Sequence, residues 1–571
     1  MIFNTIIFIL TFYLIIVSSI GYGIIFSRYL VNYKKPHENL NLGLIGLLGL
    51  ILITFISYLT NFIYHHNYLH NSLLISVGII FFIYYFINNK VGFNKKLFFL
   101  FLVSLFYITA LFISKNHDDF GYYHLPFSLS LTENKTIFGL GHLNLGYRHH
   151  SSLLYLNSIF YLPFVKYFLF HSSNLIIFIF VNYYLLRNIL DNYKKKISFI
   201  FLLNLFFFIL INVKFTRIAE FGTDIAGQLI LIIFFNLLIK IKDFSKKDIS
   251  KENGYKYLYL ISTIFLFLMT LKAYFAIYAI FLLIIYENYF YLIKKKLFIF
   301  KNIIFLFLFF ILFVILNLAN TGCIVYPIPT LCFSESLFWA QTGDSVESLQ
   351  FHLETWAKAG KGAGYSLDEL ENYIVNFNWV SSWLDKYFFT KMSDYLLTIL
   401  AVLLTVSLSF KFKLKKVITK NDLFFLFLFF VVLFEWFNKH PSLRYGGYFP
   451  VAYFLFFIFL KFINYNKIKS KVNNVIFRRK VLVLLFLPIF FFNVKNLHRI
   501  YKEFNRTDDY RYTSFPFQHI HKQEYRKLST FDGEGYQYLT NGWCWATPTP
   551  CGGGQSLKHE VIYGFEFFYD R

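Results

Sequence analysis

Long apolar stretches alternate with short polar ones along most of the chain. Many have close to the roughly 20 residues that an α-helix needs to cross the hydrocarbon core of a bilayer. They are bounded by Lys, Asn or Tyr rather than by Gly/Pro turns, which favours helices over barrel strands. The pattern predicts an all-α polytopic membrane protein with about fourteen transmembrane helices. The predicted spans are Ile6–Phe26, Leu42–Leu59, Leu73–Ile87, Leu97–Ile113, Ser172–Leu186, Ile197–Val213, Ile225–Ile241, Tyr257–Leu271, Ala273–Ile293, Ile303–Leu318, Tyr395–Phe410, Leu423–Phe437, Pro450–Phe462 and Val481–Phe492.

The distribution of Lys and Arg predicts the orientation of these spans. The basic connections contain Arg28/Lys34/Lys35, Lys90/Lys95/Lys96, Lys194–Lys196, Lys246/Lys247/Lys251/Lys256, Lys294–Lys296, Lys411/Lys413/Lys415/Lys416 and Lys467/Lys469/Lys471/Arg478/Arg479/Lys480. The other set comprises residues 61–70, 114–171, 214–224, 319–394, 438–448 and 493–571. The two sets alternate along the chain, and basic connections are typically cytoplasmic. We therefore expect the N-terminus and the C-terminal tail to face away from the cytoplasm.

Two segments need separate interpretation. Ser151–Phe170 is apolar, but the alternation holds only if it does not cross, so we expect an interfacial or re-entrant helix anchored by its aromatic residues. Ile6–Phe26 lacks a basic n-region and a small-residue cleavage site, which indicates a retained helix. The predicted organisation is a transmembrane domain at residues 1–494, with outer loops 114–171 and 319–394, and an outward-facing tail at residues 495–571.

Composition and charge agree with this picture. The chain has 571 residues, of which 57% are hydrophobic and only 15% charged, with a mean hydropathy of +0.52. A soluble globular chain of this length does not need such a mixture, so the expected partner is a lipid bilayer. The formal net charge of +24 could suggest nucleic acid. However, the basic residues fall in short clusters between apolar stretches, which membrane topology explains, and we expect no nucleic-acid partner.

All four cysteines lie in predicted outward segments. Cys323 and Cys332 share one segment, and Cys544 and Cys551 share the other. We expect one disulfide within each pair, in an oxidising compartment. Zinc binding is the alternative, but nine- and seven-residue spacings without a nearby pair of histidines are less typical of it. Trp543 and Trp545 lie in the second loop, where they either contact a saccharide or belong to a stapled tail.

The segment after the fourth predicted span is the richest in candidate chemistry. Asp118 and Asp119 come just past the helix, and Arg148, His149 and His150 follow in the same loop. A carboxylate at the bilayer boundary avoids most of the roughly 2.5 to 3.5 kcal/mol insertion cost at mid-membrane, yet can be partly desolvated. Such a group suits a base acting on a membrane-bound substrate. The alternative is that the two carboxylates simply solvate the end of the helix.

The sequence Asp118-Asp119-Phe-Gly-Tyr-Tyr-His-Leu-Pro resembles the acidic pair in the first large outer loop of GT-C glycosyltransferases. The resemblance covers this motif, the many-helix layout and the outward loops. This sequence departs from the family pattern in that three spans precede the motif-bearing helix. It implies that Asp118 or Asp119 acts as a base or binds a metal, so a divalent metal ion is a candidate cofactor. Tyr122, Tyr123 and His124 become candidate substrate-binding residues, together with Arg148, His149 and His150.

Further ionisable residues are predicted near the outer membrane surface. They are Arg217, Glu220 and Asp224 between two spans, Lys272 at a break in a long apolar stretch, and His440 and Arg444 before Tyr-Gly-Gly. Recognition of a lipid phosphate would need such cations. The alternatives are that Arg217 pairs with Glu220 or Asp224, and that Lys272 only marks a turn. Arg444 is the most distinctive, because the backbone of the following glycines can approach a ligand closely.

These observations support three hypotheses. The first is a glycosyltransferase that moves a sugar from a polyprenyl-phosphate donor to a glycan or lipid acceptor at the outer face, with the lipid-linked donor implied by the resemblance. The second is a polysaccharide polymerase or ligase of another multi-helix class, which depends on Arg217, Arg444 and outer-loop histidines. The third is a lipid-linked saccharide transporter or flippase, although the acidic pair lies in a loop and no inverted repeat is visible. We expect a bacterial inner-membrane protein with its active site facing the periplasm.

Overall fold

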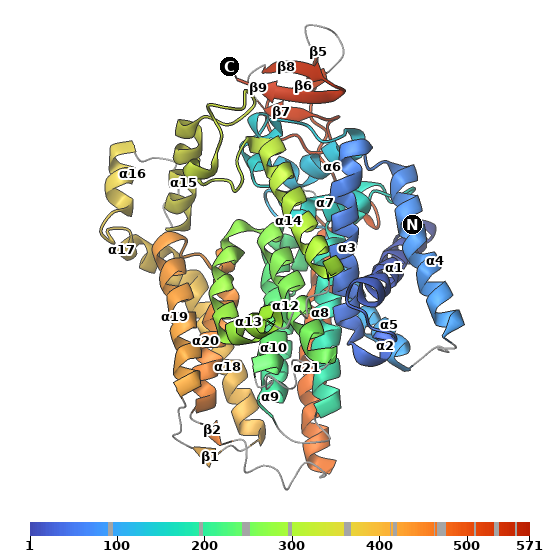
Figure 1. The fold of residues 1–571 in the computed structure, drawn as a ribbon, viewed down its shortest axis with the longest axis vertical. Coiled ribbons are helices and arrows are strands. Elements are labelled where there is room, and N and C mark those ends of the chain that lie inside the picture. The colour runs from blue at the N-terminus through green and yellow to red at the C-terminus, as the bar shows by residue number, and fades with distance from the viewer. Residues whose placement is uncertain are drawn as a thin grey trace.

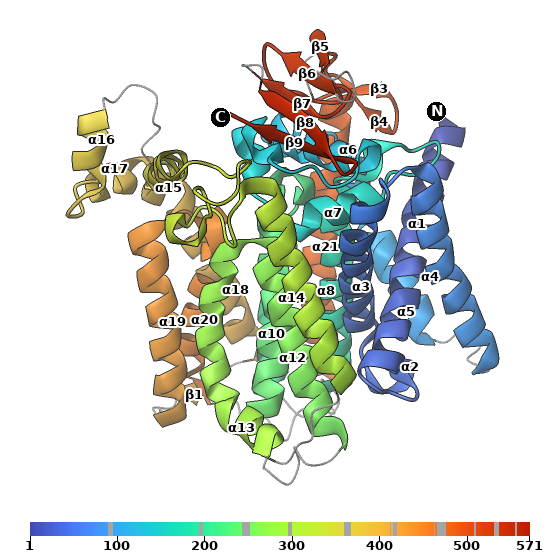
Figure 2. The ribbon, with the colours of Figure 1, turned by 45° about the horizontal axis from the view of Figure 1, so that its top comes forward.

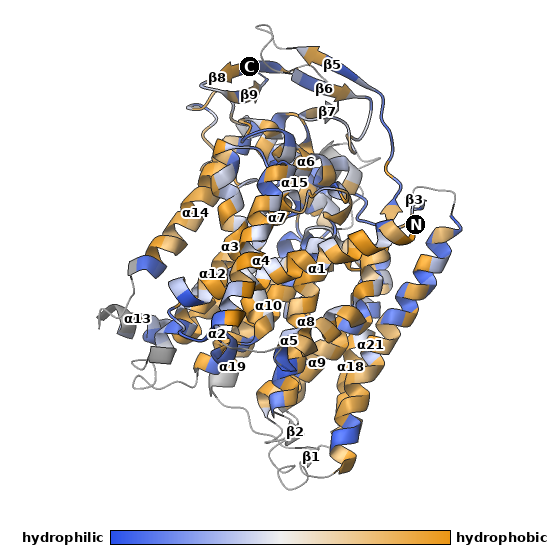
Figure 3. Cartoon of the chain, turned by 90° about the vertical axis from the view of Figure 1, so that its right-hand side faces the viewer, coloured by the Kyte–Doolittle hydropathy of each residue, from blue (hydrophilic) through white to orange (hydrophobic). Residues whose placement is uncertain are grey.

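The fold was analysed in a computed structural model of the chain. It describes residues 1–89, 95–192, 198–242, 252–294, 300–358, 367–410, 413–414, 420–461, 463–464, 475–506, 510–529, 536–553 and 557–570. The structure is mostly helical, with long helices side by side and a small group of strands beyond one end of them (Figure 1). Hydrophobic residues run along the long helices, whereas polar residues are more frequent in the strands (Figure 3).

The first half of the chain supplies the helices around which the others pack. Their bounds are α1 Ile2–Ile25, η1 Phe26–Leu30, α2 Pro36–Asn39, α3 Leu42–Ile63, α4 Tyr68–Asn88, α5 Lys95–Phe106, η2 Ile108–Phe112, α6 Leu125–Glu133, α7 Ser152–Ile159, α8 Ser172–Asn192, α9 Phe199–Lys214, α10 Asp224–Lys242 and α12 Glu252–Leu271. Small residues allow some of them to approach closely. A Cβ atom at Gly49 of α3 would lie 1.6 Å from the carbonyl oxygen of Ser19 in α1, which shows how tightly these two helices pack.

The second half adds further helices and the strands. The helices are η8 Ala273–Ile285, α13 Tyr286–Lys294, α14 Phe300–Thr321, α15 Gly343–Ala357, α16 Leu367–Ile374, α17 Val380–Trp383, η10 Leu384–Met392, α18 Ser393–Phe410, α19 Lys420–Lys439, η11 Leu443–Gly447, α20 Tyr448–Lys461 and α21 Val475–Phe504. The strands are β1 Lys413–Leu414, β2 Ile463–Asn464, β3 Tyr512–Ser514, β4 Phe517–Gln518, β5 Tyr525–Ser529, β6 Tyr536–Thr540, β7 Cys551–Gly553, β8 Lys558–Ile562 and β9 Phe565–Tyr569.

Ten helical segments within the described residues are long and apolar enough to cross a membrane. They are Ile2–Leu30, Leu42–Ile63, Tyr68–Asn88, Ser172–Asp191, Asp224–Ile241, Gly254–Leu271, Ala273–Tyr291, Lys301–Thr321, Val380–Phe410 and Leu443–Leu460. Each overlaps a predicted span. The other four predicted spans coincide with α5 and η2, α9, α19 and α21, which are helical but not among these ten. The protein is therefore an integral membrane protein with ten candidate spans, and fourteen crossings remain a prediction.

The predicted outward and cytoplasmic connections lie at opposite ends of the helices. Figure 2 shows β5–β9, α6, α7, α15 and α16 at one end, which we call the strand end, and α2, β1 and α13 at the other, which we call the basic end. This arrangement agrees with the predicted alternation but does not show which end faces the cytoplasm. Many of the basic positions lie outside the described residues. They are Lys90, Lys194–Lys196, Lys246/Lys247/Lys251, Lys295/Lys296, Lys411/Lys415/Lys416 and Lys467/Lys469/Lys471.

Ser151–Phe170 does not form a crossing helix. Its longest helical piece is α7, which has only 8 residues, all of them buried. A bilayer-spanning helix needs about 20 residues. The segment therefore contains a short buried helix, α7, at the strand end, as expected for a segment that does not cross.

The C-terminal tail corrects the all-α expectation, because it forms small antiparallel and mixed sheets. Strands β5 and β6 pair antiparallel, β6 and β7 pair parallel, and β8 and β9 form a hairpin. Outside the hydrocarbon, water can satisfy the edges of such sheets. The tail packs on the first outer loop: the Phe567 and Phe138 rings stack 4.5 Å apart, and Thr549 donates two hydrogen bonds to Glu133. Both predicted disulfides, Cys323–Cys332 and Cys544–Cys551, are present.

Candidate functional site

Four sequence-distant segments bring ionisable side chains together at the strand end. They are the turn before η3, Phe120–His124; the start of α10; the break between α12 and η8; and η11. These segments supply Asp119, Asp224, Lys272 and Arg444, respectively, which we call the charge cluster. Because each lies at the end of a helix rather than at its middle, the cluster is close to the expected membrane boundary.

Asp224 is the centre of the charge cluster. One carboxylate oxygen lies 3.2 Å from Lys272 Nζ and the other 3.2 Å from Arg444 Nε. The Asp224 side chain is only 5% exposed, so these two cations compensate a charge that is almost fully removed from water. Arg444 Nη2 also lies 3.7 Å from Asp119 Oδ2, and this connects the outer-loop carboxylate to the other three residues.

The position of Arg444 is set by α10. Gln228 donates hydrogen bonds from Nε2 to the carbonyl oxygens of Leu443 and Arg444, at 3.4 and 3.1 Å, and accepts one from Tyr448 N–H at 3.1 Å. Gly446 has φ +82 and lies against the Tyr274 ring, where a side chain would be strained. The Arg-Tyr-Gly-Gly turn is thus a fixed platform, and the Arg444 side chain remains 43% exposed.

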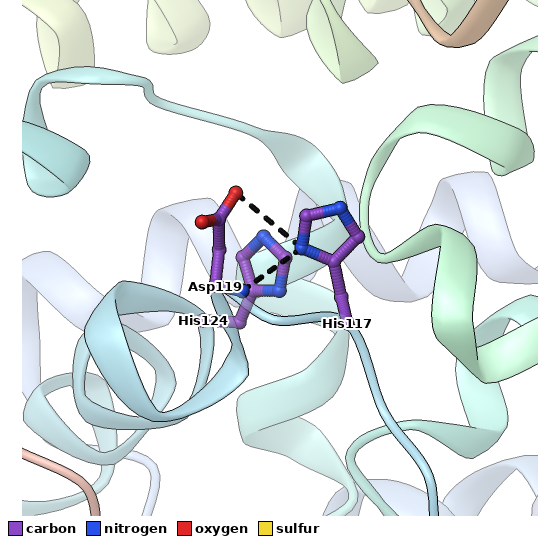
Figure 4. Close-up of side chains that lie close together, drawn as sticks. All are labelled: His117, Asp119 and His124. Carbon is purple, nitrogen blue, oxygen red and sulfur yellow. Dashed lines mark hydrogen bonds and ion pairs between the residues drawn. The ribbon is translucent and has the colours of Figure 1, made fainter. Parts of the chain in front are cut away.

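His117, Asp119 and His124 form a second grouping that shares Asp119 with the charge cluster (Figure 4). His117 Nδ1 lies 3.3 Å from Asp119 Oδ2 and accepts a hydrogen bond from Asp119 N–H at 3.0 Å. One candidate ligand atom from each residue lies within 4.8 Å of the others. Two imidazoles and one carboxylate are donors typical of Zn²⁺ and related ions rather than of Mg²⁺ or Ca²⁺. These three residues could therefore hold a divalent metal ion.

The two histidines are enclosed by the backbone of the loop before α10. Gly222 has φ +52, and a Cβ atom there would lie 2.5 Å from His124 Cε1 and 3.0 Å from His117 Cγ. Burial lowers the pKa of His117 and lowers that of His124 further, because a charged imidazole is poorly solvated there. His124 Nε2 is buried without a hydrogen-bond partner among the described residues. Neutral imidazoles of this kind are suited to metal binding or proton exchange.

The two adjacent aspartates have different surroundings. Asp118 is exposed and accepts a hydrogen bond from the Tyr510 hydroxyl of the tail at 3.2 Å. The Asp119 side chain is 34% exposed and points to His117 and Arg444. Of the two, only Asp119 belongs to the charge cluster.

The Arg-His-His motif lies among packed residues of the outer loops, and its role in substrate binding stays a prediction. Arg148 is buried and donates hydrogen bonds to the Gly141 carbonyl oxygen at 3.0 Å and to Ser345 Oγ at 2.8 Å, so it connects two outer loops. His150 lies among Tyr58, Tyr155 and Phe313, and burial lowers its pKa to about 3. Burial also lowers the pKa of His149 to about 3, with a further contribution from the charge of Lys272.

Other predicted residues lie beside the charge cluster or apart from it. Glu220 pairs with Arg217 and, at 3.4 Å, with Lys115. His440 Nε2 lies 3.4 Å from Glu435, and burial lowers the pKa of His440 to about 4. Arg217 thus pairs with Glu220, as its alternative interpretation predicted. Lys272, by contrast, does more than mark a turn, because it neutralises Asp224.

The tail covers the aromatic part of the motif. The backbone N–H of Trp545 donates a hydrogen bond to the Gly121 carbonyl oxygen at 2.9 Å, and a Cβ atom at Gly121 would lie 2.3 Å from the Trp545 ring. Tyr122 lies 6.4 Å from the Trp543 ring, and burial raises the pKa of Tyr122 and Tyr123. These contacts agree with the interpretation of Trp543 and Trp545 as part of a stapled tail.

The sequence analysis did not single out His117 and Gln228. His117 belongs to the quoted motif, but a single histidine beside two aspartates has no distinctive spacing. Gln228 is one turn after Asp224 on the same helix face, and that i, i+4 spacing was the only available signal.

The fold and the site define a polytopic membrane protein with a partly buried charge cluster at one end of its helices. A family model described as a domain of unknown function, DUF8201, matches residues 5–450. The chain belongs to this family. The match includes every residue of the charge cluster and ends before the tail. No curated protein and no solved structure matches the chain.

Proposed function

We propose that the protein is a membrane glycosyltransferase of the GT-C type. It would transfer a sugar from a polyprenyl-phosphate donor to a hydroxyl group of a glycan or lipid acceptor at the strand end. The observation that carries the proposal is the position of Arg444, which lies between a half-exposed carboxylate, Asp119, and a buried one, Asp224, with Lys272 on the far side. An acid/base group and two cations thus share one site at the expected membrane boundary.

Asp119 is the proposed base. Its carboxylate is exposed enough to reach an acceptor hydroxyl, and it lies in the outer loop that follows the fourth predicted span. In this mechanism Asp119 takes the hydroxyl proton while the acceptor oxygen attacks the anomeric carbon of the donor sugar. The bond between that carbon and the phosphate oxygen breaks, and the phosphate leaves with the bonding electrons.

Arg444 and Lys272 are the proposed phosphate-binding residues. Arg444 presents a planar guanidinium that suits phosphate oxygens, and Lys272 Nζ adds a point charge close by. Both cations are held in place by Asp224 before a ligand arrives, so little reorganisation is needed when negative charge develops on the leaving phosphate. Asp224 is a positioning residue in this scheme.

A divalent metal ion is compatible with the same site. His117, Asp119 and His124 would hold it, and it would supply a Lewis acid beside the donor phosphate. Asp119 would then act as a ligand rather than as a free base. Measuring the zinc and manganese content of the purified protein, wild type against Asp119→Asn, separates these two roles.

The test compares Asp119→Asn with Asp118→Asn as the matched control. Asp118 has the same charge and the neighbouring position, but it contacts the tail instead of the charge cluster. We expect Asp119→Asn to lower turnover of a polyprenyl-phosphate-linked sugar in membranes by about 10² to 10⁴-fold, and Asp118→Asn to be close to wild type. Membrane abundance of each variant must be normal.

The arginine-centred polymerase or ligase makes the opposite prediction. Because Arg444 touches two carboxylates, a reaction that depends mainly on this arginine is the strongest competitor. Near-native activity of Asp119→Asn together with an inactive Arg444→Ala would reject the GT-C-type mechanism in favour of that competitor.

A further inference from the structure

The basic end contains a cavity that the proposed function does not use. Its volume is about 190 Å³, far above the roughly 10–15 Å³ that one water molecule requires. The residues around it come from the segment that contains α2, from the start of α3, and from α5, α8, α10 and α12. We call it the basic cavity. The cavity-lining residues used below are Glu38, Lys96, Tyr184, Arg187, Asp191 and Lys240.

Among the described residues, three cations on three different helices line the basic cavity. Lys96 on α5 donates a hydrogen bond from Nζ to the His37 carbonyl oxygen at 2.8 Å. Lys240 on α10 lies over the Tyr184 ring, with Nζ 5.7 Å from its centroid. Arg187 on α8 pairs through Nη2 with Asp191 at 3.0 Å, and its side chain is 35% exposed. The convergence of these helices therefore brings positive charge to one space.

Two described carboxylates, Glu38 and Asp191, line the basic cavity beside these cations. Asp191 is engaged by Arg187, and Glu38 pairs with Lys35, which does not line the cavity, at 3.1 Å. Among the described lining residues, three basic side chains thus accompany two acidic ones, and Glu38 shares its charge with a lysine outside the cavity. Phosphate oxygens accept hydrogen bonds from Arg and Lys side chains that lie together in this way.

The depth of the basic cavity identifies the kind of anion. Lys96 directly precedes a predicted span, Arg187 directly follows one, and Lys240 lies in the last turn of a third. We therefore expect all three at the level of the lipid headgroups. Phospholipid phosphates lie at this depth, and Lys and Arg side chains near helix ends reach toward them.

We propose that the basic cavity binds the phosphate group of an anionic phospholipid from the leaflet at the basic end. Arg187 and Lys240 hold the phosphate oxygens, and Lys96 adds positive charge to the same cavity. The same chemistry would accept free inorganic phosphate, so the test separates the two sources. This proposal is independent of the charge cluster at the strand end and of any sugar transfer.

The experiment measures thermal unfolding of the delipidated full-length protein in a neutral detergent. Phosphatidylglycerol, phosphatidylcholine or inorganic phosphate is added to wild type, Arg187→Gln and Lys240→Gln. Arg479→Gln is the matched control, because Arg479 is exposed on the predicted cytoplasmic side and does not line the cavity. We expect phosphatidylglycerol to raise the melting temperature of wild type and control. Each cavity variant should need about tenfold more lipid for half of this rise.

The remaining results decide the proposal. A response to phosphatidylglycerol without one to inorganic phosphate assigns the site to a lipid. If phosphatidylglycerol and inorganic phosphate both stabilise the wild type, and both responses are weaker in Arg187→Gln and Lys240→Gln, the site recognises the phosphate group alone. Equal stabilisation by phosphatidylcholine, or cavity variants that respond as wild type does, would overturn the proposal. If Lys240→Gln fails to accumulate, Arg187→Gln and the charge-conserving Arg187→Lys still decide it, since Arg187→Lys should retain most of the response.

Discussion

The charge cluster and the basic cavity are built from the same kinds of side chain but differ in how their charges are balanced. In the charge cluster, Asp119 and Asp224 face Lys272 and Arg444 across 3.2 to 3.7 Å, so the opposite charges compensate one another. In the basic cavity, Lys96, Arg187 and Lys240 surround an open volume. The first arrangement suits groups that must be held in place for a reaction, whereas the second suits retention of an anion.

The largest expected difference between the two ends is their accessibility from outside the cell. The four native cysteines form disulfides, so a single introduced cysteine can report its side of the membrane. Tyr563, in the β8–β9 turn, is 99% exposed, and Lys35, at the basic end, is also exposed. We expect an impermeant thiol reagent to label Tyr563→Cys in intact cells and Lys35→Cys only after permeabilisation. The reverse pattern would place the charge cluster in the cytoplasm.

Asp224→Asn should produce the next largest effect, on stability. It removes the carboxylate that neutralises Lys272 and Arg444, and Asp224 is the most buried member of the charge cluster. Because the two cations are partly exposed, we expect a loss of about 2 kcal/mol in the free energy of unfolding, below the full cost of breaking a buried pair. Denaturation in detergent, followed by tryptophan fluorescence, measures it.

Glu220→Gln is the control for that prediction. Glu220 also pairs with two cations, but its side chain is 26% exposed, so its loss should cost less than about 1 kcal/mol. The double variant Asp224→Asn/Lys272→Met should recover part of the lost free energy of unfolding, since it removes both members of the Asp224–Lys272 pair. Equal costs for the two single variants would show that burial does not distinguish the charge cluster from the neighbouring surface pairs.

The smallest effect is expected at the basic cavity. Arg187→Gln breaks a half-exposed i, i+4 pair with Asp191, and we expect it to change the free energy of unfolding of the lipid-free protein by no more than about 0.5 kcal/mol. The same unfolding assay without added lipid measures this change. A cost as large as that of Asp224→Asn would indicate that Arg187 is part of the packing rather than a ligand-binding residue.

Local sequence was sufficient for the helices and for the cysteine pairs. Hydrocarbon accepts only long apolar segments whose backbone groups are paired internally, so a span such as Leu42–Leu59 can be recognised from its own residues. Cys544 and Cys551 are seven residues apart and share one loop, so their pairing needed little information from the rest of the chain. The resemblance to an acidic outer-loop motif likewise depends on adjacent positions.

Only the tertiary structure decided which charged residues belong together. Asp119 and Arg444 are separated by most of the chain, and their contact depends on how α10 holds the η11 turn through Gln228. The difference between the surroundings of Asp118 and Asp119 also needed the fold, because the Tyr510 hydroxyl of the tail donates a hydrogen bond to Asp118. Long-range helix packing leaves no periodic pattern in the sequence. The hydrophobic pattern therefore determined which segments enter the membrane, and their packing determined which polar groups meet at its two surfaces.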